Sequence, residues 1–504
     1  MPSNFIGNSK PRIVVIGAGI GGLTAGALLA HRGYQVLVVD QALVPGGCAS
    51  TFKRKGFTFD VGATQVAGLE PGGIHHRIFS QLEIDIPQAT PCDPACAVYL
   101  PGETQPINVW RDRKKWQAER ERQFPGSQDF WQLLDNLFQA SWKFQGRDPV
   151  LPPRNLWDLW QLTKAVRLGT LITLPYALFT VGDALRFLGL ENDQRLRTFL
   201  DLQLKLYSQV DAAETALLYA ATALNVSQLP QGLFHLQGSM QVLSDRLVEA
   251  LTRDGGKLLM RHTAKEIVVK DGKATGVVIR HQNEEWTEPA DQVIANVTVQ
   301  NLVQLLGENA PKGYKHRVEK LPSASGAFVV YLGVDASAIP PGCPPHLQFL
   351  YDAEGVIGEN NSLFVSVSHP GDGRAPAGQA TIIASSFVDP KRWRQCQDYE
   401  ALKQQYTQEA IARLSQFFQL TPETIVHQEA ATPRTFARYT ARDRGIVGGI
   451  GQRIPTFGPF GFANRTPVER LWLVGDSTHP GEGTAGVSYS ALTVVRQITV
   501  NSKR

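Results

Sequence analysis

Glycine-rich turns at both ends of the chain, with a helix-prone stretch between them, predict an α/β fold whose Rossmann-type domain is discontinuous. The first turn follows a short apolar strand near residue 12, and the second follows another near residue 471. A chain of 504 residues is too long for one simple core. We therefore expect an α+β domain to be inserted into the Rossmann-type domain.

The N-terminal turn carries the pattern G-x-G-x-x-G. Gly17 allows a tight turn, Gly19 lets a pyrophosphate approach the backbone, and Gly22 lets the next helix pack close to the sheet. That helix is expected to begin at Gly21 and to end at Arg32. Its N-terminus directs free N–H groups and the positive end of the helix dipole at the phosphates.

The segments around this turn favour a dinucleotide site over a glycine turn that binds nothing. An apolar strand, Arg12–Ile16, precedes the turn, and a second strand, Gln35–Val39, follows the helix. The second strand ends at Asp40, about 20 residues past the glycines, where a carboxylate accepts a hydrogen bond from a ribose hydroxyl. The prediction depends on this context, because the glycine pattern alone also occurs by chance.

Two short motifs follow the second strand. Gly46 and Gly47 let the backbone pass close to a ligand, since neither carries a side chain. The segment Gly56–Gly62 is typical of a short strand that ends in a turn. Both motifs lie where flavoproteins with two dinucleotide-binding motifs wrap around FAD.

The C-terminal turn is the second strong indication of a dinucleotide site. A buried strand begins at Leu471 and ends at Gly475 and Asp476, and a glycine loop then leads into a helix. Asp476 is placed to bind the ribityl chain or the pyrophosphate through hydrogen bonds. Gly486 and Val487 open the helix, whose positive end can face N1 and the C2 carbonyl of a flavin. The two ends therefore predict one discontinuous domain that closes around a cofactor.

The stretch from about residue 75 to residue 234 is aromatic and prone to form helices. Apolar residues at helical spacing predict helices over Ser127–Ala140 and Leu156–Arg167. Leu168–Val181 is strongly apolar, but Pro175 interrupts it and it falls short of the ~18 residues that cross a bilayer. It fits a buried core helix as well as it fits contact with a membrane.

Other features of this stretch also allow two interpretations. The apolar side chains along one side of the helix Leu156–Arg167 either pack in the core or contact a membrane surface. The basic run Arg111–Lys115 is either a solvated face or a contact with anionic lipid. Seven aromatic residues are either ordinary core or the wall of an apolar tunnel: Phe130, Trp131, Phe138, Trp157, Trp160, Phe179 and Phe187.

The remaining pattern alternates between helix and strand. A helix is expected over Met240–Thr252, and four strands over Lys257–Met260, Lys265–Lys270, Ala274–Arg280 and Gln292–Ala295, with a hairpin turn at Asp271-Gly272. Residues from about 301 to 464 are mixed. Their turn-rich part holds four arginines that are either surface groups or partners for an acid or a flavin carbonyl: Arg434, Arg438, Arg442 and Arg444.

Composition argues against several classes of function. The net charge of +4 is too small to indicate a nucleic-acid partner. Five cysteines do not make a disulfide framework, and no second pair completes a metal site around Cys92 and Cys96. The first eleven residues lack the segments of a signal peptide and are expected to be a short disordered lead.

Four segments together resemble the phytoene desaturase-like family of FAD-dependent carotenoid desaturases and isomerases, within the amine oxidase superfamily. They are GAGIGGLTAGALLAHRGYQVLVVD, PGG with GFTFDVGAT, LQGSMQVLSDRLVEAL and LWLVGDSTHPGEGTAGVSYSAL. The last looks closest to the cyanobacterial C-3′,4′ desaturases of acyclic carotenoid ends. Many members carry an arginine after the glycine pair where this chain has Cys48, so an arginine from the turn-rich part is a candidate substitute.

The resemblance implies a set of cofactor-binding residues and a division of the chain. The backbone at Ala264 is expected to meet the adenine. FAD is expected to contact Gly17, Gly19, Gly21, Gly22, Asp40, Gly46, Gly47, Ala264, Gly475, Asp476, Gly486 and Val487. Segments 1–75, 235–300 and 465–504 are expected to form the FAD-binding domain, and 76–234 and 301–464 the substrate domain, with 76–234 facing a membrane.

The resemblance also implies a reaction. A desaturase transfers a hydride from an acyclic end of a hydrophobic carotenoid to flavin N5 and releases a proton. His479 and Glu482 are candidate proton acceptors, each equally suited to a structural role, so no catalytic residue is assigned. The final electron acceptor is either a quinone or oxygen, and the enzyme is expected on the cytoplasmic side of a cyanobacterial-type membrane as a peripheral protein.

Other functions remain open at this point. A carotenoid cis–trans isomerase would use reduced FAD without net oxidation, and an amine oxidase would place aromatic residues across the flavin from a polar cleft. A pigment-binding escort without flavin would leave the intact set of glycines and acids unexplained. NAD as the permanent cofactor would leave the C-terminal Gly-Asp loop unexplained.

Overall fold

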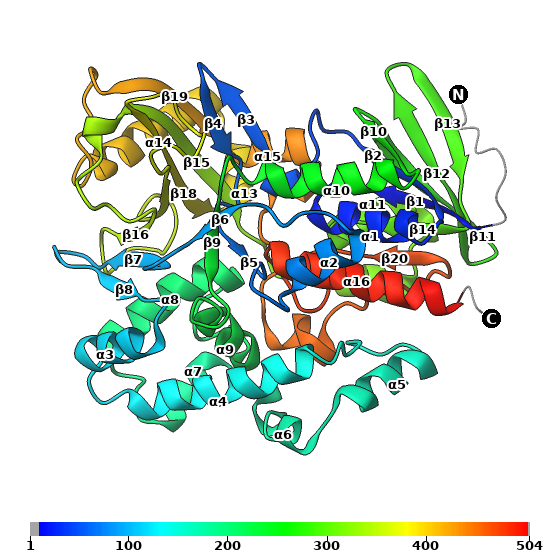
Figure 1. Ribbon diagram of the computed structural model, residues 1–504, viewed down its shortest axis with the longest axis horizontal. Coiled ribbons are helices and arrows are strands. Elements are labelled where there is room, and N and C mark those ends of the chain that lie inside the picture. The colour runs from blue at the N-terminus through cyan, green and yellow to red at the C-terminus, as the bar shows by residue number, and fades with distance from the viewer. Residues whose placement is uncertain (1–9, 502–504) are drawn as a thin grey trace.

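The computed structural model of the protein describes residues 10–501. Figure 1 shows two sheet-containing parts side by side, with a layer of helices below them. The lead predicted for the first eleven residues falls almost entirely on residues 1–9, outside the described residues.

A parallel sheet of five strands organises the nucleotide-binding part, in the order β10-β2-β1-β14-β20. Its strands come from distant parts of the chain, as predicted. Their bounds are β1 (Arg12–Ile16), β2 (Gln35–Asp40), β10 (Lys257–Met260), β14 (Gln292–Ala295) and β20 (Leu471–Leu473). Strands from the three segments predicted to form the FAD-binding domain, 1–75, 235–300 and 465–504, thus pair in one sheet. The exact boundaries of these segments stay a prediction.

Both faces of this sheet are covered, which explains why its strands are apolar throughout. Successive side chains of β1 point to opposite faces, so Ile13 and Val15 join one core and Val14 and Ile16 the other. The first core includes α1 (Ile20–His31), α2 (Ile74–Leu82), α10 (Gln241–Arg253) and α16 (Thr484–Asn501). The second includes α11 (Val299–Leu306), α12 (Lys312–Glu319) and the antiparallel strands β11 (Thr263–Lys270), β12 (Lys273–His281) and β13 (Glu284–Pro289).

A mixed sheet of seven strands forms the second part, in the order β19-β15-β18-β17-β16-β7-β8. Its strands are β7 (Cys96–Tyr99), β8 (Ile107–Val109), β15 (Gly326–Asp335), β16 (His346–Leu350), β17 (Ser362–Val367), β18 (Gln379–Val388) and β19 (Ile425–Ala431). The helices α13 (Pro390–Gln395), α14 (Tyr399–Leu414) and α15 (Pro433–Thr440) belong to the same part of the chain. Strands β7 and β8 come from the stretch that the sequence predicts to be helical, so both segments of the predicted substrate domain share this sheet.

The layer of helices lies below both sheets in Figure 1. It contains α3 (Arg113–Gln123), α4 (Gln128–Gln145), α5 (Leu156–Ala165), α6 (Leu168–Leu171), α7 (Val181–Phe187), α8 (Gln194–Ser208) and α9 (Leu217–Asn225). The hairpin β3 (Thr51–Arg54) and β4 (Phe57–Asp60), and the small sheet of β5 (Val66–Ala67), β9 (Leu233–Leu236) and β6 (Ala89–Pro91), complete the described strands.

The structure excludes one of the two interpretations of Leu168–Val181, because the segment is not a buried core helix. It breaks into α6 and a 3₁₀ turn, η2 (Leu174–Leu178), and most of its large apolar side chains face outward. The side chain of Leu168 is 87% exposed, and Phe187 at the end of α7 is 82% exposed. Trp160 of α5 is exposed as well, so the apolar stripe of that helix is not core.

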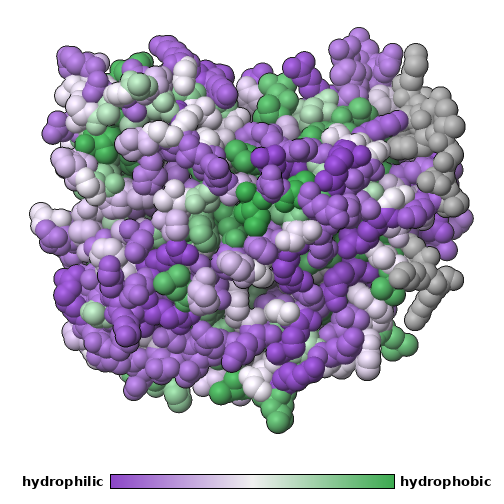
Figure 2. All heavy atoms as spheres, viewed as in Figure 1, coloured by the Kyte–Doolittle hydropathy of each residue, from purple (hydrophilic) through white to green (hydrophobic). Residues whose placement is uncertain are grey.

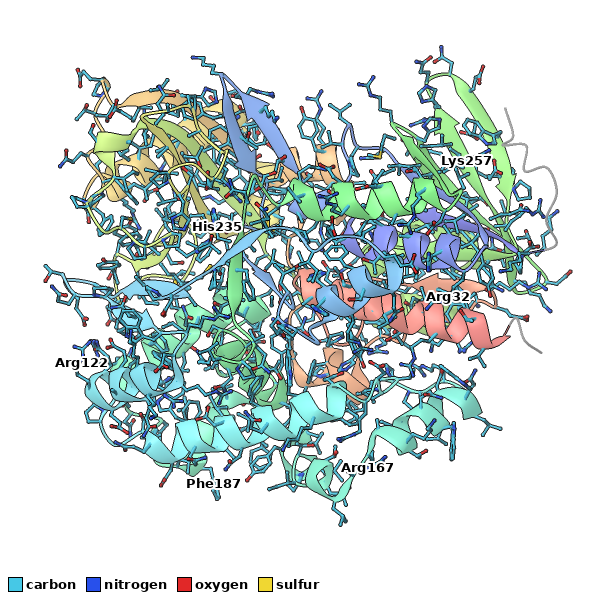
Figure 3. All side chains as sticks on the ribbon, viewed as in Figure 1. Arg32, Arg122, Arg167, Phe187, His235 and Lys257 are labelled. Carbon is cyan, nitrogen blue, oxygen red and sulfur yellow. The ribbon has the colours of Figure 1, made fainter. Side chains whose placement is uncertain are left out.

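A buried arginine holds three separate segments together where the parts of the molecule meet. Arg374 Nη2 donates to Asp60 Oδ2 of β4 at 3.1 Å, and Nη1 donates to the Leu236 carbonyl of β9 at 2.7 Å. Asp372 Oδ2 accepts from Nη1 at 3.2 Å, and His235, labelled in Figure 3, completes the cluster. The Arg374 side chain is 2% exposed, so both carboxylates depend on it for their compensating charge.

Replacement of this arginine tests that dependence. Arg374→Met leaves Asp60 and Asp372 buried without a cation, so we expect the free energy of unfolding to fall by about 3–5 kcal/mol. Arg246→Met on the exposed side of α10 is the matched control and should change it by less than about 0.5 kcal/mol. Chemical denaturation measures both, and equal stability of the two variants would contradict this role of Arg374.

Candidate functional site

A cavity of about 1090 Å³ opens at the carboxyl edge of the five-stranded sheet. The carboxyl ends of parallel strands meet at one edge, and ligands of open α/β sheets bind in the crevice outside it. Of the residues predicted to hold the cofactor, all but Gly22 line this cavity: Gly17, Gly19, Gly21, Asp40, Gly46, Gly47, Ala264, Gly475, Asp476, Gly486 and Val487.

Gly22 does not line the cavity, because its role is close packing. A Cβ atom built on Gly22 would lie 2.0 Å from the Gly17 carbonyl oxygen, so the turn closes only around a glycine. Gly17 itself has φ +98°, and a Cβ atom there would lie 2.5 Å from the Asn296 carbonyl oxygen. The predicted division of labour among the glycines is therefore visible in the packing of the turn.

Asn296 is a wall residue that the sequence analysis missed. It follows β14 directly, and its side-chain Nδ2 donates to the Gly17 carbonyl at 3.4 Å. A Cβ atom on Gly19 would lie 2.9 Å from the same Nδ2. The position of Asn296 at the carboxyl end of a strand could have identified it, because that edge collects the ligand contacts.

Asp40 stands at the end of β2, as predicted. Its Oδ2 accepts from the Ala18 N–H at 2.7 Å and its Oδ1 from the Ala42 N–H at 2.8 Å, which fixes the carboxyl group at the cavity. Burial raises the pKa of the Asp40 carboxyl, although these two backbone donors oppose the change. Each oxygen retains a further lone pair for a hydroxyl donor.

The N-terminus of α1 is open toward the cavity. Gly19 is the N-cap residue, and no side chain caps the helix there. The N–H groups of the first helical turn and the positive end of the dipole are thus left for an anion. Together with the close approach at Gly17 and Gly19, this arrangement fits a dinucleotide pyrophosphate.

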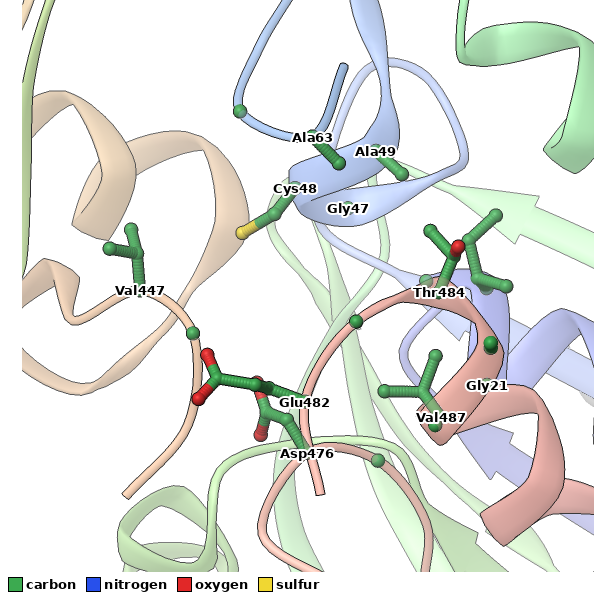
Figure 4. A pocket seen from close by; sticks show the side chains of 18 of the residues that line it. Gly21, Gly47, Cys48, Ala49, Ala63, Val447, Asp476, Glu482, Thr484 and Val487 are labelled. Atoms are coloured by element: carbon green, nitrogen blue, oxygen red, sulfur yellow. The ribbon is translucent and has the colours of Figure 1, made fainter. Parts of the chain in front are cut away.

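On the opposite wall, the loop after β20 brings acidic groups to the cavity. Figure 4 shows the carboxyl groups of Asp476 and Glu482 on this wall and the Cys48 thiol facing them. Arg442 Nη2 donates to Asp476 Oδ2 at 2.7 Å, so one arginine of the turn-rich stretch does reach an acid. Burial raises the pKa of the Cys48 thiol, and the charge of Arg442 opposes the change.

The two candidate proton acceptors differ in their placement. Glu482 lines the cavity, and Gln209 Nε2 donates to its Oε2 at 3.1 Å. Burial raises the pKa of the Glu482 carboxyl, and the nearby Asp476 charge raises it further. His479 is not among the lining residues, and burial lowers its pKa to about 3.

Away from this polar wall, the cavity continues between apolar side chains. None of the seven aromatic residues that the sequence allowed either as core or as tunnel wall lines it. They are Phe130, Trp131, Phe138, Trp157, Trp160, Phe179 and Phe187, of which the first three are buried. Its walls instead include Trp142 of α4, Tyr219 of α9, Val226, Leu233 of β9 and Phe364 of β17. The spacing of apolar residues predicted where the helices lie. It did not predict which side of each helix faces the cavity, because that depends on how the helices pack against the seven-stranded sheet.

Comparisons with known proteins agree with this geometry. The family model described as an NAD(P)-binding Rossmann-like domain matches residues 15–82. Among solved structures, the cyclohexylamine oxidase of Brevibacterium oxydans IH-35A superposes with a TM-score of 0.63 at 17% identity, covering 98% of this chain and 100% of that one. The chain therefore shares its overall fold with this amine oxidase, and its N-terminal part matches a Rossmann-like nucleotide-binding domain.

Proteins with similar sequences point to carotenoids. Prolycopene isomerase 2, chloroplastic, of an Oncidium hybrid cultivar is 28% identical over 507 residues, covering 97% of this chain and 84% of the relative. The neurosporene-forming phytoene desaturase of Rhodobacter capsulatus is 27% identical over 515 residues, covering 97% and 94%. The chain is thus a homologue of carotenoid desaturases and isomerases along nearly all of its length.

The glycine turn offers a direct test of the site. In Gly22→Ala the added Cβ meets backbone rather than a movable side chain, so the turn must shift, and we expect a loss of about 1–3 kcal/mol of stability. We also expect impaired dinucleotide binding. Gly313→Ala in α12 has open space around its Cβ and serves as the control. Thermal unfolding and cofactor retention measure the effect, and a Gly22→Ala protein that matched the control would contradict it.

Proposed function

We propose that the protein is an FAD-dependent oxidoreductase of carotenoid biosynthesis that desaturates an acyclic carotenoid end in the manner of C-3′,4′ desaturases. One observation carries the proposal: a single cavity extends from the dinucleotide edge of the sheet into an apolar space between α4, α9 and the seven-stranded sheet. The carotenoid relatives and the resemblance of the loop after β20 support the same substrate class.

FAD would lie along the carboxyl edge of the sheet, with its pyrophosphate at the N-terminus of α1 and its ribose at Asp40. When bound, the flavin supplies a hydride acceptor at N5. The N-terminus of α16, which begins at Thr484 beside the cavity, would stabilise negative charge on the ring. The electrons would then pass to a quinone or to oxygen.

The chain itself must hold a long apolar molecule and keep water away from it. Trp142, Leu233 and Phe364 offer apolar surface for this purpose, whereas an amine oxidase would need a polar cleft for its substrate. The apolar walls therefore disfavour an amine. A carotenoid cis–trans isomerase remains the alternative, because four relatives are named prolycopene isomerases and the same cavity suits such a substrate.

The pigment product separates the two reactions. We expect bacteria that make a carotene with one acyclic end to accumulate a pigment two hydrogen atoms lighter when they also make this protein. Its absorption should lie at longer wavelength, because the new double bond extends the conjugation. Liquid chromatography with mass detection measures this, and a product of unchanged mass would favour the isomerase instead.

We also propose that the protein works at the cytoplasmic side of a membrane, as a peripheral protein. No helix within residues 10–501 is long and apolar enough to cross a bilayer. The supporting observation is an apolar patch at the lower edge of the molecule in Figure 2, where Figure 1 places α6. We define the apolar patch by its exposed side chains: Leu156, Leu159, Trp160, Leu168, Leu171, Ile172, Leu174, Leu178, Phe179 and Phe187.

The charge around the apolar patch favours anionic lipid as its partner. Arg154, Lys164 and Arg167 are exposed within this stretch. Of its two acidic residues, Asp158 is buried and Asp183 pairs with the exposed Arg186. Basic groups beside an apolar helix face attract an anionic bilayer surface. The patch also lies close to the cavity, because α6 packs on α4 and η2 packs on α9, two helices that line it.

Vesicle flotation tests this surface. The double variant Leu168→Asp/Leu174→Asp should lose binding to vesicles that contain anionic lipid, because it puts two charges into the inserted face. Val356→Asp changes an equally apolar side chain, 72% exposed, outside the apolar patch and should bind as the wild type does. Wild-type protein that fails to float with such vesicles would contradict the proposal.

A further inference from the structure

We propose that Glu482 is the catalytic base, which takes the proton released by the carotenoid when its hydride passes to the flavin. This inference rests on the proposed desaturase function. Among the described residues, Glu482 is the cavity-lining acid whose carboxyl group neither an arginine nor a pair of backbone N–H groups holds.

The carboxyl group of Glu482 is fixed in place but keeps one oxygen free. Gln209 Nε2 holds Oε2 at 3.1 Å, and a Cβ atom on Gly448 would lie only 2.5 Å from that oxygen. Oε1 is buried and has no hydrogen-bond partner among the described residues. A rigid carboxyl group with one unpartnered oxygen beside the cavity can contact a bound substrate.

The other acids of the cavity are already engaged. Asp476 accepts from Arg442, and Asp40 accepts from two backbone N–H groups at the dinucleotide edge. His479 does not line the cavity, and its lowered pKa of about 3 makes it a weak base. Glu482 is therefore the group in the described cavity whose proton affinity and free lone pairs both suit proton transfer.

The surroundings of Glu482 make its carboxylate a stronger base than an ordinary glutamate. Burial and the charge of Asp476 raise its pKa, whereas Gln209, Arg442 and Gln452 oppose the change. Tyr219 of α9 and Tyr207 of α8 are titratable groups that line the cavity nearby, and the Tyr219 hydroxyl donates to the Tyr207 carbonyl. A base whose pKa approaches the working pH accepts a proton most efficiently.

Bound flavin would supply the two-electron acceptor, and a quinone or oxygen would reoxidise it. One C–H bond of the saturated carbon pair would break as a hydride leaves with two electrons. The C–H bond on the neighbouring carbon would then break, its electron pair would form the new C=C bond, and Glu482 Oε1 would take the proton. The carotenoid would lose two hydrogens in all, and release of the proton to solvent would restore the Glu482 carboxylate.

Glu482→Gln is the decisive variant, because it keeps the size and polarity of the neutral acid but cannot accept a proton. We expect it to slow substrate-driven bleaching of the flavin absorbance in anaerobic single turnovers by about 10²–10⁴-fold. The wild-type rate should rise with pH through a pKa above the ordinary value for glutamate, and this rise should vanish in the variant. Glu70→Gln replaces another buried acid of raised pKa that does not line the cavity, and should leave rate and profile unchanged.

The pH dependence of folding stability tests the raised pKa of Glu482 independently of any enzymatic activity. Its folded-state pKa is raised, so the folded protein binds more protons than the unfolded chain above the ordinary glutamate pKa. Stability should therefore fall as pH rises through that window, and it should fall less in Glu482→Gln. Gln209→Asn removes a donor that lowers this pKa, so the rising limb of the rate profile should move to higher pH.

The outcomes separate the inference from the function on which it rests. Wild-type protein that bleaches flavin with a carotenoid, and a Glu482→Gln protein with the same rate and profile, would overturn the inference and leave the proposed function intact. Wild-type protein that holds flavin but never reacts with a carotenoid would overturn both. Absence of any pH-dependent stability difference between wild type and Glu482→Gln would contradict the raised proton affinity.

Discussion

Close backbone packing at the carboxyl edge of the five-stranded sheet is the constraint on which the site depends. The turn after β1 closes only because Gly22 leaves room for the Gly17 carbonyl, and Asn296 then fits against the same turn. This packing brings the N-terminus of α1 to the edge and holds its N–H groups open toward the cavity. The strands that support it come from residues 12–40, 257–295 and 471–473, so the site exists only when both chain ends have folded together.

The wall formed by the loop after β20 is shaped by a different constraint, because it buries the acidic side chains of Asp476 and Glu482. Asp476 is compensated by Arg442, as Asp60 and Asp372 are by Arg374 at the junction of the two sheets. Glu482 has only amide and distant cationic support, and its proton affinity rises as a result. A buried acid without a compensating charge has a raised pKa, which suits a site of proton transfer. The same acid would add no stability at a position with a purely structural role.

The sequence was most informative where one local pattern determines one local structure. The glycine fingerprint, Asp40 and the Gly475-Asp476 turn predicted the dinucleotide edge, because tight turns leave few alternatives. It was least informative for Leu168–Val181, whose apolar residues fitted a core helix and an exposed apolar face equally well, and most of which face outward. Apolar content alone cannot separate a core segment from an exposed apolar face, since the same residue types occur in both.

Long-range pairing accounts for the other differences. The sequence pattern does not show that β7 and β8 join a sheet built mainly from residues 326–431, or which aromatic residues face the cavity. Likewise, four arginines in a turn-rich stretch gave no indication that Arg442 is the one that reaches Asp476. These facts depend on how distant segments meet, which no local periodicity encodes.

Identification of the bound cofactor tests the whole account most directly. Supernatant released by heat from folded, purified protein should show isoalloxazine fluorescence equivalent to one flavin per chain. Folded protein that releases no flavin, even after reconstitution with FAD, would contradict the assignment of the cavity and every step that follows from it.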